Sequence, residues 1–158
     1  MKIMKSADSA RIDYGELLAD LVFVQVDQFN VVDRRLRSDL DMVLIEYLPM
    51  RVIDGTPNCR VQDLANGVRI TVGGASKAVD RLSKRGWAER APHPGDRRSS
   101  ILRLTPEGER MLAAASGVVS EETSRRLAIT LDAAETATLA DLLSRLRADE
   151  DGSTIEGD

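Results

Sequence analysis

Apolar positions repeat with the period of an α-helix over most of this chain. From Glu16 onward an apolar stripe returns every three or four residues, which predicts a first helix of about five turns. Ser38 followed by Asp41 resembles a capping box, so we expect a second helix to begin there. Pro49 is expected to help end that helix, because proline disfavours the helical conformation of the residue before it.

Two short helical patterns occupy the middle of the chain. Residues 51–60 are rich in turn-forming residues and predict a loop, after which Val61–Val68 is expected to form a short helix. Thr71 can cap a further helix over Val72–Arg85, whose apolar residues recur at i, i+3, i+4 and i+7, and Gly86 is expected to end it. Two helices joined by so short a turn predict a helix-turn-helix motif.

An extended pattern follows these helices. Residues 87–90 and 99–104 are expected to be strands, and the prolines and glycine of 92–96 predict the turn of a β-hairpin between them. Thr105 and Pro106 then mark a helix start, with a hydroxyl available to cap and a proline at the first helical position. A hairpin directly after a helix-turn-helix predicts a winged helix.

The C-terminal part of the chain is helical by the same criteria. The helix that starts at Pro106 is expected to reach about Ile129, and Asp132 with Glu135 forms a capping box for one more helix. That last helix carries an apolar stripe of leucines: Leu139, Leu142, Leu143 and Leu146. Residues 1–12 and 149–158 lack a sustained period and are expected to be flexible.

The composition agrees with a mainly α fold. The chain has 158 residues, 42% of them hydrophobic and only 3% aromatic, which fits one soluble domain with helical extensions packed through aliphatic side chains. A single cysteine rules out an internal disulfide, and neither an export leader nor an apolar run long enough to span a membrane is evident. We therefore expect a cytoplasmic protein.

Charge is distributed unevenly along the chain. Between residues 69 and 104 there are nine basic and three acidic residues, whereas the whole chain has a net charge of −4. A basic segment in an acidic protein is typical of a surface that meets the phosphates of nucleic acid, although a solvated charged face would look the same in a charge count. The position of this segment within a helix-turn-helix favours double-stranded DNA as a partner.

The helix at 72–85 carries the candidate base contacts. Its apolar residues face inward, which leaves these residues to face DNA: Thr71, Gly73, Gly74, Ser76, Lys77 and Arg81. Ser76 and Lys77 can hydrogen-bond base edges in the major groove, and Thr71 at the helix start suits a phosphate. The two glycines either allow the backbone to approach DNA closely or form a flexible helix start without function.

Several motifs at fixed spacing carry a family resemblance. They are Val61–Ala65, Val79–Leu82 followed by Arg85 and Gly86, Asp96-x-Arg98, and Leu104-Thr105-x-x-Gly108. Through these motifs the chain resembles the MarR (multiple-antibiotic-resistance regulator) family of winged helix-turn-helix transcription factors, over about 130 residues if the flanking helices are included.

The resemblance implies an organisation as well as a function. It implies a winged helix-turn-helix domain over 38–104, flanked by dimerisation helices in 13–37 and 105–148. It also implies a homodimer that binds a pseudo-palindromic operator and acts as a repressor released by a small molecule. The chain departs from the family in having Arg69 where a glycine is usual, and Gly73-Gly74 where polar residues often read bases.

The resemblance further implies that the tip of the wing enters the minor groove. Arg98 would insert there with Asp96 holding it in place, since a narrow groove concentrates negative potential. Arg90 and Arg97 would touch nearby phosphates, and Ser99 is a further candidate. Alternatively, the Asp96–Arg98 pair serves only to stabilise the hairpin, although an exposed ion pair contributes just about 0 to 1 kcal/mol.

Three residues are candidates for an effector site. A small aromatic or phenolic effector is expected near Phe29, Tyr47 and Met50. The alternative at the level of function is a winged helix that binds protein and does not touch DNA, although such a module would not need the basic segment.

Other chemistry finds little support in the sequence. Cys59 stands next to Arg60, which could lower the pKa of the thiol and permit redox sensing. With one histidine and one cysteine far apart, a zinc-responsive site would have to be built mostly from carboxylates, which suit zinc less well. We expect no metal, no cofactor and no enzymatic activity.

Overall fold

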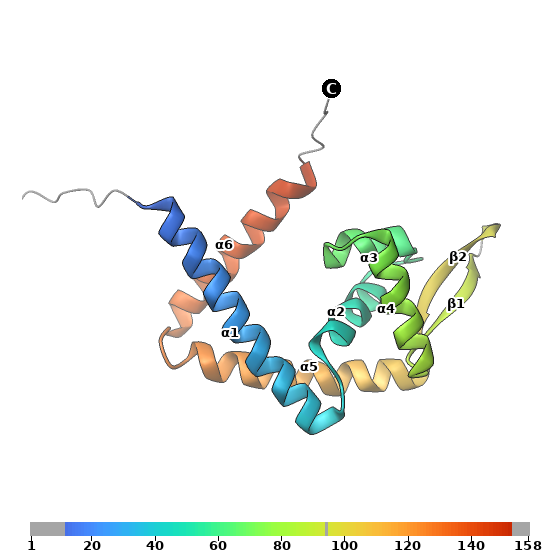
Figure 1. Ribbon diagram of the computed structural model, residues 1–158, viewed down its shortest axis with the longest axis horizontal. Helices are drawn as coiled ribbons and strands as arrows, with labels where there is room; N and C mark the ends of the chain where they lie inside the picture. Colours follow the sequence, from blue (N-terminus) through green and yellow to red (C-terminus); the bar gives the residue numbers. More distant parts are fainter. Residues whose placement is uncertain (1–11, 94, 153–158) are drawn as a thin grey trace, which may run out of the picture.

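The computed structural model describes residues 12–93 and 95–152, and at positions 93, 96–99 and 149–152 it describes the backbone alone. This part of the chain forms helices and one antiparallel hairpin (Figure 1). The elements are α1 (Tyr14–Leu40), α2 (Leu44–Gly55), α3 (Val61–Val68), α4 (Val72–Lys84), β1 (Ala88–His93), β2 (Asp96–Leu104), α5 (Pro106–Leu127) and α6 (Ala133–Gly152). The mainly α fold with a β-hairpin after a helix-turn-helix is therefore confirmed.

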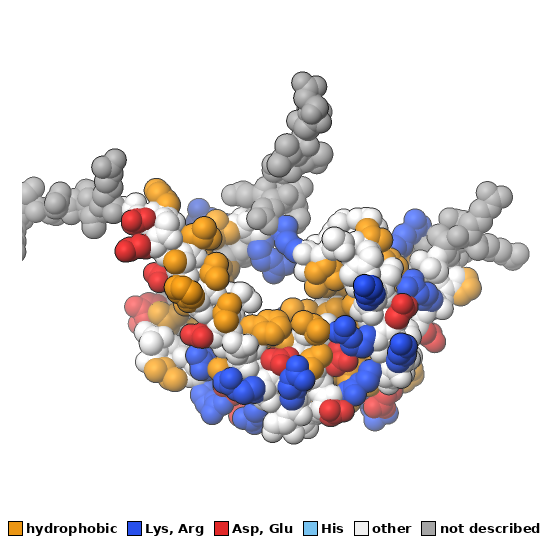
Figure 2. All heavy atoms as spheres, viewed as in Figure 1, with side chains coloured by type: hydrophobic (Ala, Val, Ile, Leu, Met, Phe, Trp, Pro, Cys, Tyr) orange, Lys and Arg blue, Asp and Glu red, His pale blue; other side chains and the backbone are white. Residues whose placement is uncertain are grey.

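Helix α5 is the element against which α1 and the winged unit pack. α1 crosses the C-terminal half of α5, and the winged unit, formed by α2, α3, α4 and the hairpin, packs against the rest of it (Figure 1). α6 turns back from the C-terminal end of α5 and, in this view, passes behind α1. In the described chain, no helix is both long and apolar enough to cross a membrane. Figure 2 shows that the surface is hollowed between α1 and the winged unit.

The first helix ends later than the sequence pattern indicates. Asp13 caps its start by accepting hydrogen bonds from the backbone N–H groups of Gly15 (2.8 Å) and Glu16 (3.2 Å). The helix then continues through Ser38, so the expected capping box of Ser38 and Asp41 is wrong. Asp41 ends the helix in the left-handed conformation, at φ 50°, and its N–H bonds a carbonyl of the last turn.

The second helix is longer than expected because Pro49 does not end it. The helix runs on to Gly55, and the expected loop at 51–60 shortens to 56–60. A proline inside a helix costs about 3 kcal/mol. Burial of one face of the helix in the core offsets that cost, since Tyr47, Met50 and Ile53 are all at most 4% exposed.

Helix α1 caps the start of α2 from outside. The residue before α2, Val43, has no side-chain acceptor, and Asp33 Oδ1 of α1 accepts a 2.7 Å hydrogen bond from the backbone N–H of Leu44 instead. Burial raises the pKa of Asp33, but hydrogen bonds from Arg37 and Leu44 and the charge of Arg37 outweigh that effect and hold the pKa below its usual value. The carboxylate therefore stays charged and fixes the joint between α1 and α2.

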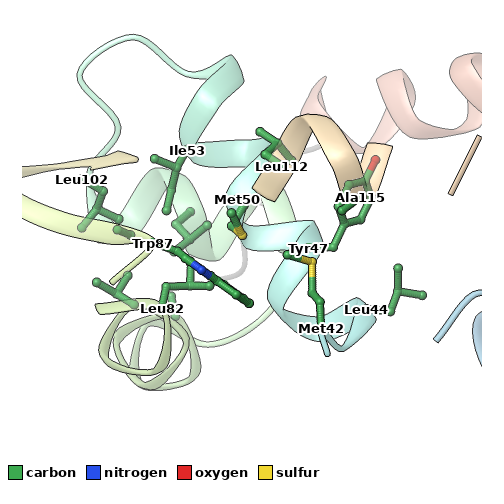
Figure 3. Packing of buried hydrophobic residues seen from close by; sticks show 14 of the residues in the cluster. Met42, Leu44, Tyr47, Met50, Ile53, Leu82, Trp87, Leu102, Leu112 and Ala115 are labelled. Atoms are coloured by element: carbon green, nitrogen blue, oxygen red, sulfur yellow. The ribbon is translucent and has the colours of Figure 1, made fainter. Parts of the chain in front are cut away.

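The core lies between α2, α4, α5 and the root of the hairpin, and α1 and α3 also contribute buried residues to it (Figure 3). The members that the figure labels come from α2, α4, α5, β2 and the segments before α2 and β1: Met42, Leu44, Tyr47, Met50, Ile53, Leu82, Trp87, Leu102, Leu112 and Ala115. Because α4 and the hairpin pack into one core, their outer surfaces are held in a fixed relation. The last helix α6 extends to Gly152, past the expected end at Ala148.

Candidate nucleic-acid interface

The turn between α3 and α4 adopts an unusual backbone conformation. α3 ends at Val68 as the sequence predicts, and Arg69 follows at φ 59°, in the left-handed region. The N–H of Ile70 then bonds the carbonyl of Ala65 at 3.0 Å, which closes the end of the helix. A left-handed residue with a side chain costs about 1 kcal/mol, which explains why a glycine would suit this position.

Helix α4 begins where the sequence places it. The hydroxyl oxygen of Thr71 accepts a 3.1 Å hydrogen bond from the backbone N–H of Gly74, so Thr71 is confirmed as the cap. Ala75, Val79 and Leu82 are fully buried, and they fix which face of α4 points away from the core. Helix α4 ends at Lys84, with Arg85 as its C-cap.

The opposite face of α4 carries a row of cations. Lys77, Arg81 and Lys84 are all exposed, and none of them has an ion-pair partner within the described residues. The spacing i, i+4 and i+7 places them on one side of the helix. Lys84 was not among the expected contacts, although its helical spacing from Lys77 could have identified it. Ser76 is half-buried at the edge of this face.

The two glycines of α4 occupy different surroundings. A Cβ at Gly73 would have no atom within 4 Å, so the backbone is open to solvent there. A Cβ at Gly74 would lie 3.3 Å from the hydroxyl oxygen of Thr71 and 3.7 Å from Ile70, so a side chain would crowd the cap. The backbone at Gly73 can therefore be approached closely by another molecule. The glycine at position 74 is explained by the cap, which leaves little space for a side chain.

Two arginines of the basic segment interact with other side chains of the same protein. Arg85 donates to the side chain of Asp41 at 3.0 Å and lies over the ring of Trp87, with its guanidinium carbon 4.1 Å from the ring centre. Arg90 on β1 forms a 3.6 Å ion pair with Asp80 on α4. Arg85 thus has a structural task, and Arg90 links the hairpin to α4.

The hairpin is longer than expected. β1 and β2 pair from Ala88 opposite Leu104 as far as His93 opposite Asp96, with a register shift at the outer end. The backbone N–H of Leu102 also bonds the carbonyl of Cys59 at 2.7 Å, which anchors the hairpin to the loop before α3. The side chains of the expected wing contacts lie outside the described part of the structure: Asp96, Arg97, Arg98 and Ser99.

Thr105 joins the root of the hairpin to α5. Its hydroxyl donates to the carbonyl of Gly86 at 2.6 Å and accepts from the N–H of Gly108 at 3.0 Å, and its own N–H bonds the carbonyl of Trp87 at 3.0 Å. Thr105 is thus confirmed as the cap of α5. These bonds give the Thr105-x-x-Gly108 motif a structural explanation.

The expected effector residues belong to the core in this structure. Met50 is fully buried, Tyr47 is 3% exposed with its hydroxyl 3.4 Å from that of Ser116, and Phe29 packs against the same core. None of the three lines either of two cavities in the described chain, at the α1–α6 side and beneath the hairpin. An effector that touched Tyr47 or Met50 would have to open the core, and the assignment stays a prediction.

Cys59 lacks the surroundings of a reactive thiol. Its side chain is fully buried, and burial, with a further contribution from the negative charge of Asp63, raises the pKa of the thiol to about 11. The expectation that Arg60 lowers this pKa is therefore wrong. Among the described residues no cluster of three or more His, Cys, Asp or Glu side chains is placed to hold a metal ion.

Comparison with known proteins agrees with this geometry. The model of the MarR family matches residues 41–99. The Multiple antibiotic resistance protein MarR of Escherichia coli (strain K12) is 31% identical over 109 residues, which are 69% of this chain and 76% of that protein. The MarR protein of Salmonella typhimurium is 31% identical over 84 residues, and there the match spans 53% of this chain and only 58% of the relative's length.

A solved structure extends the comparison to nearly the whole fold. The crystal structure of a mutant MarR from E. coli complexed with operator DNA has a TM-score of 0.71 and 26% sequence identity. The match covers 86% of this chain and 99% of that one. The similarity therefore includes α1 and the C-terminal helices as well as the helix-turn-helix and the hairpin.

Proposed function

Because the chain belongs to the MarR family, we propose that it is a dimeric, sequence-specific DNA-binding transcriptional regulator, and that it acts as a repressor released by a small molecule. The observation that carries this proposal is the cationic face of α4, where Lys77, Arg81 and Lys84 stand exposed on the side away from the core. A protein-binding module would have no need of such a face. Two relatives are transcriptional regulators by their names, and the proposal accordingly gives this chain no catalytic role and a cytoplasmic location.

Within this proposal α4 is the recognition helix in the major groove. Ser76 and Lys77 hydrogen-bond base edges, because a lysine suits the O6 and N7 acceptors of guanine. Arg81, Lys84 and the helix start at Thr71 contact phosphates, and the bare backbone at Gly73 allows α4 to approach closely. The ion pair between Arg90 and Asp80 keeps the hairpin beside α4 as the two meet adjacent grooves.

The tip of the hairpin supplies the second part of the DNA contact. In the proposal Arg98 enters the minor groove, held by Asp96, while Arg97 and Ser99 contact the neighbouring backbone. The support is the length of the hairpin, which extends to residues 93 and 96 and so carries this segment away from the core. Minor-groove insertion of arginine adds affinity and a preference for A·T-rich sequence.

Dimerisation rests on apolar surface that a single chain leaves exposed. Figure 2 shows apolar side chains along α1, where Leu17, Leu18, Leu21, Val22 and Phe23 are each at least 46% exposed. Leu142, Leu143 and Leu146 of α6 are each at least 44% exposed, and a groove of about 790 Å³ runs between α1, the end of α5 and α6. A second copy that covers these helices would place two α4 helices on successive major grooves, about 34 Å apart.

The same architecture supports the proposed release by an effector. An effector that binds the DNA-free dimer more tightly than the DNA-bound dimer must weaken DNA binding, and DNA must weaken effector binding by the same factor. The joint fixed by Asp33 and Leu44 lies between the dimer helices and the winged unit, where a change of angle would alter the spacing of the two α4 helices. Small aromatic acids near Phe29, Tyr47 and Met50 are the first candidates.

The proposal is tested by selecting bound duplexes from a random pool and titrating the selected site. We expect a pseudo-palindrome bound at least a thousandfold more tightly than scrambled DNA at physiological salt, which is the low end for specific binders.

Sedimentation of the full chain should show a dimer, and a Leu142→Asp, Leu146→Asp double variant should shift it toward monomer. Failure to enrich any sequence, or a monomeric wild-type protein, would overturn the corresponding half of the proposal.

A further inference from the structure

The first residue of α4 presents an apolar side chain to solvent. Val72 is 46% exposed and Ile70, in the turn before it, is 40% exposed. Between them Thr71 caps the helix, and after them Gly73 has no neighbouring atom within 4 Å of its Cβ position. The tip of α4 therefore carries a small apolar patch with open space beside it.

Val72 is not needed for the cap of α4 or for its fully buried face. The start of α4 is secured by Thr71, and the contact of α4 with the core is made by Ala75, Val79 and Leu82. Valine is also a weaker helix former than most residues. The exposed methyl groups of Val72 are therefore available to a partner outside the protein.

The chemistry of the major groove identifies that partner. The N-terminal residues of a recognition helix are the ones that reach base edges. Those edges are hydrogen-bonding groups with one apolar exception, the C5-methyl group of thymine. Ser76 follows Val72 by one turn on the same side of the helix, so an apolar contact and a polar contact would lie side by side.

We propose that Val72 reads the methyl group of a thymine in each operator half-site, next to the base pair that Ser76 contacts. This inference rests on the proposed function, because it requires α4 in the major groove. The inference also explains the two glycines, Gly73 and Gly74, that stand where the family often has polar residues. A helix start without polar side chains at these positions selects a methyl group in place of a hydrogen-bonding edge. Ile70 lies against Gly74 and adds apolar surface next to Val72.

The test removes the same methyl contact from each partner in turn. The wild-type protein first selects its operator from random duplexes, and each thymine of the half-site is then replaced by deoxyuridine, which lacks only the methyl group. At one of these positions we expect the replacement to weaken binding by the wild-type protein about three- to fivefold. This is the loss of affinity expected when one methyl group is no longer buried. In Val72→Ala the same replacement should have no effect, while affinity for scrambled DNA stays as in wild type.

Ile45→Ala is the matched control, because Ile45 is 49% exposed on the first turn of α2, beside the joint with α1. This variant should keep the full deoxyuridine effect. The inference is overturned if the selected half-site contains no methyl-sensitive thymine, or if the sensitivity persists unchanged in Val72→Ala. Either result leaves the proposed function standing, whereas a wild-type protein that selects no sequence would overturn the proposed function itself.

Discussion

Gly108 of α5 lies against the backbone of Trp87, so closely that a Cβ at Gly108 would come within 1.9 Å of the Trp87 carbonyl oxygen. The same carbonyl accepts the N–H of Thr105, so the contact is part of the joint between the hairpin and α5. Neither partner can move without disturbing the other, because both are backbone. The position of the hairpin relative to α5 therefore depends on the absence of a side chain at Gly108.

Gly108→Ala is expected to destabilise the protein. Overpacking of a tight site costs about 1 to 3 kcal/mol, which exceeds the gain of up to about 1 kcal/mol in helix propensity. Gly117→Ala is the matched control, since Gly117 lies in the same helix with no atom within 4 Å of its Cβ position. Urea unfolding should show a loss for the first variant and a small gain for the second, and equal stability of the two would refute the close contact.

Arg69 permits a separate test of backbone strain. A glycine in its place should relieve the left-handed conformation at φ 59°, whereas an alanine should retain the strain after losing the same side chain. We expect Arg69→Gly to be more stable to denaturant than Arg69→Ala by about 1 kcal/mol. If the alanine variant matched the glycine variant, the turn would not hold residue 69 in this conformation.

Cys59 should make the stability of the protein depend on pH in the alkaline range. The pKa of its thiol is raised from 9.0 to about 11 in the folded state, so the unfolded chain loses this proton first as the pH rises. The stability that the thiol contributes is present below pH 9 and is lost between pH 9 and 11, by up to about 1.4 kcal/mol per pH unit. Urea unfolding of wild type and Cys59→Ala at pH 8 and pH 10.5 isolates this effect.

The same property predicts that Cys59 is inert near neutral pH. Alkylation of the native protein by iodoacetamide at pH 7.5 should be slow and should accelerate on unfolding, because both burial and the small thiolate fraction limit the reaction. Rapid modification of the native protein with loss of DNA binding would instead support the redox-sensing alternative.

The sequence predicted features that depend on local chemistry. The cap at Thr71, the helix at Val61–Val68 and the proline-led start of α5 all depend on residues within one turn, and all are confirmed. The limits of α1 and α2 were wrong because they depend on tertiary contacts. Asp33 caps α2 from another helix, and burial retains Pro49 within it.

The candidate site shows the same division. The helical period of the apolar residues shows which face of α4 is buried, so the exposure of Lys77 and Arg81 on the other face could be predicted. Charge counting could not separate Arg85 from these residues, because its partners Asp41 and Trp87 come from other parts of the fold. Nor could aromatic content reveal that Tyr47 is buried, since that depends on how α2 packs against α5.

Arg98→Ala tests the proposed contact of the wing. Loss of one cation from the minor groove should weaken binding to every sequence, most of all where A·T pairs narrow the groove, and should lower the salt slope by about one unit. The effect on specificity should be small. Titration against A·T-rich and G·C-rich duplexes at several salt concentrations measures both quantities, and wild-type affinity at every salt would exclude Arg98 from the groove.

The most direct test of sequence-specific binding through the outer face of α4 is a titration of Lys77→Ala against operator and scrambled duplexes. If Lys77 reads a base edge, the variant should lose about 1 to 3 kcal/mol of binding free energy on the operator and much less on scrambled DNA. Arg34→Ala, which removes an exposed arginine of α1, should bind both duplexes like wild type. The account is contradicted if wild type does not distinguish the two duplexes, or if Lys77→Ala binds both as wild type does.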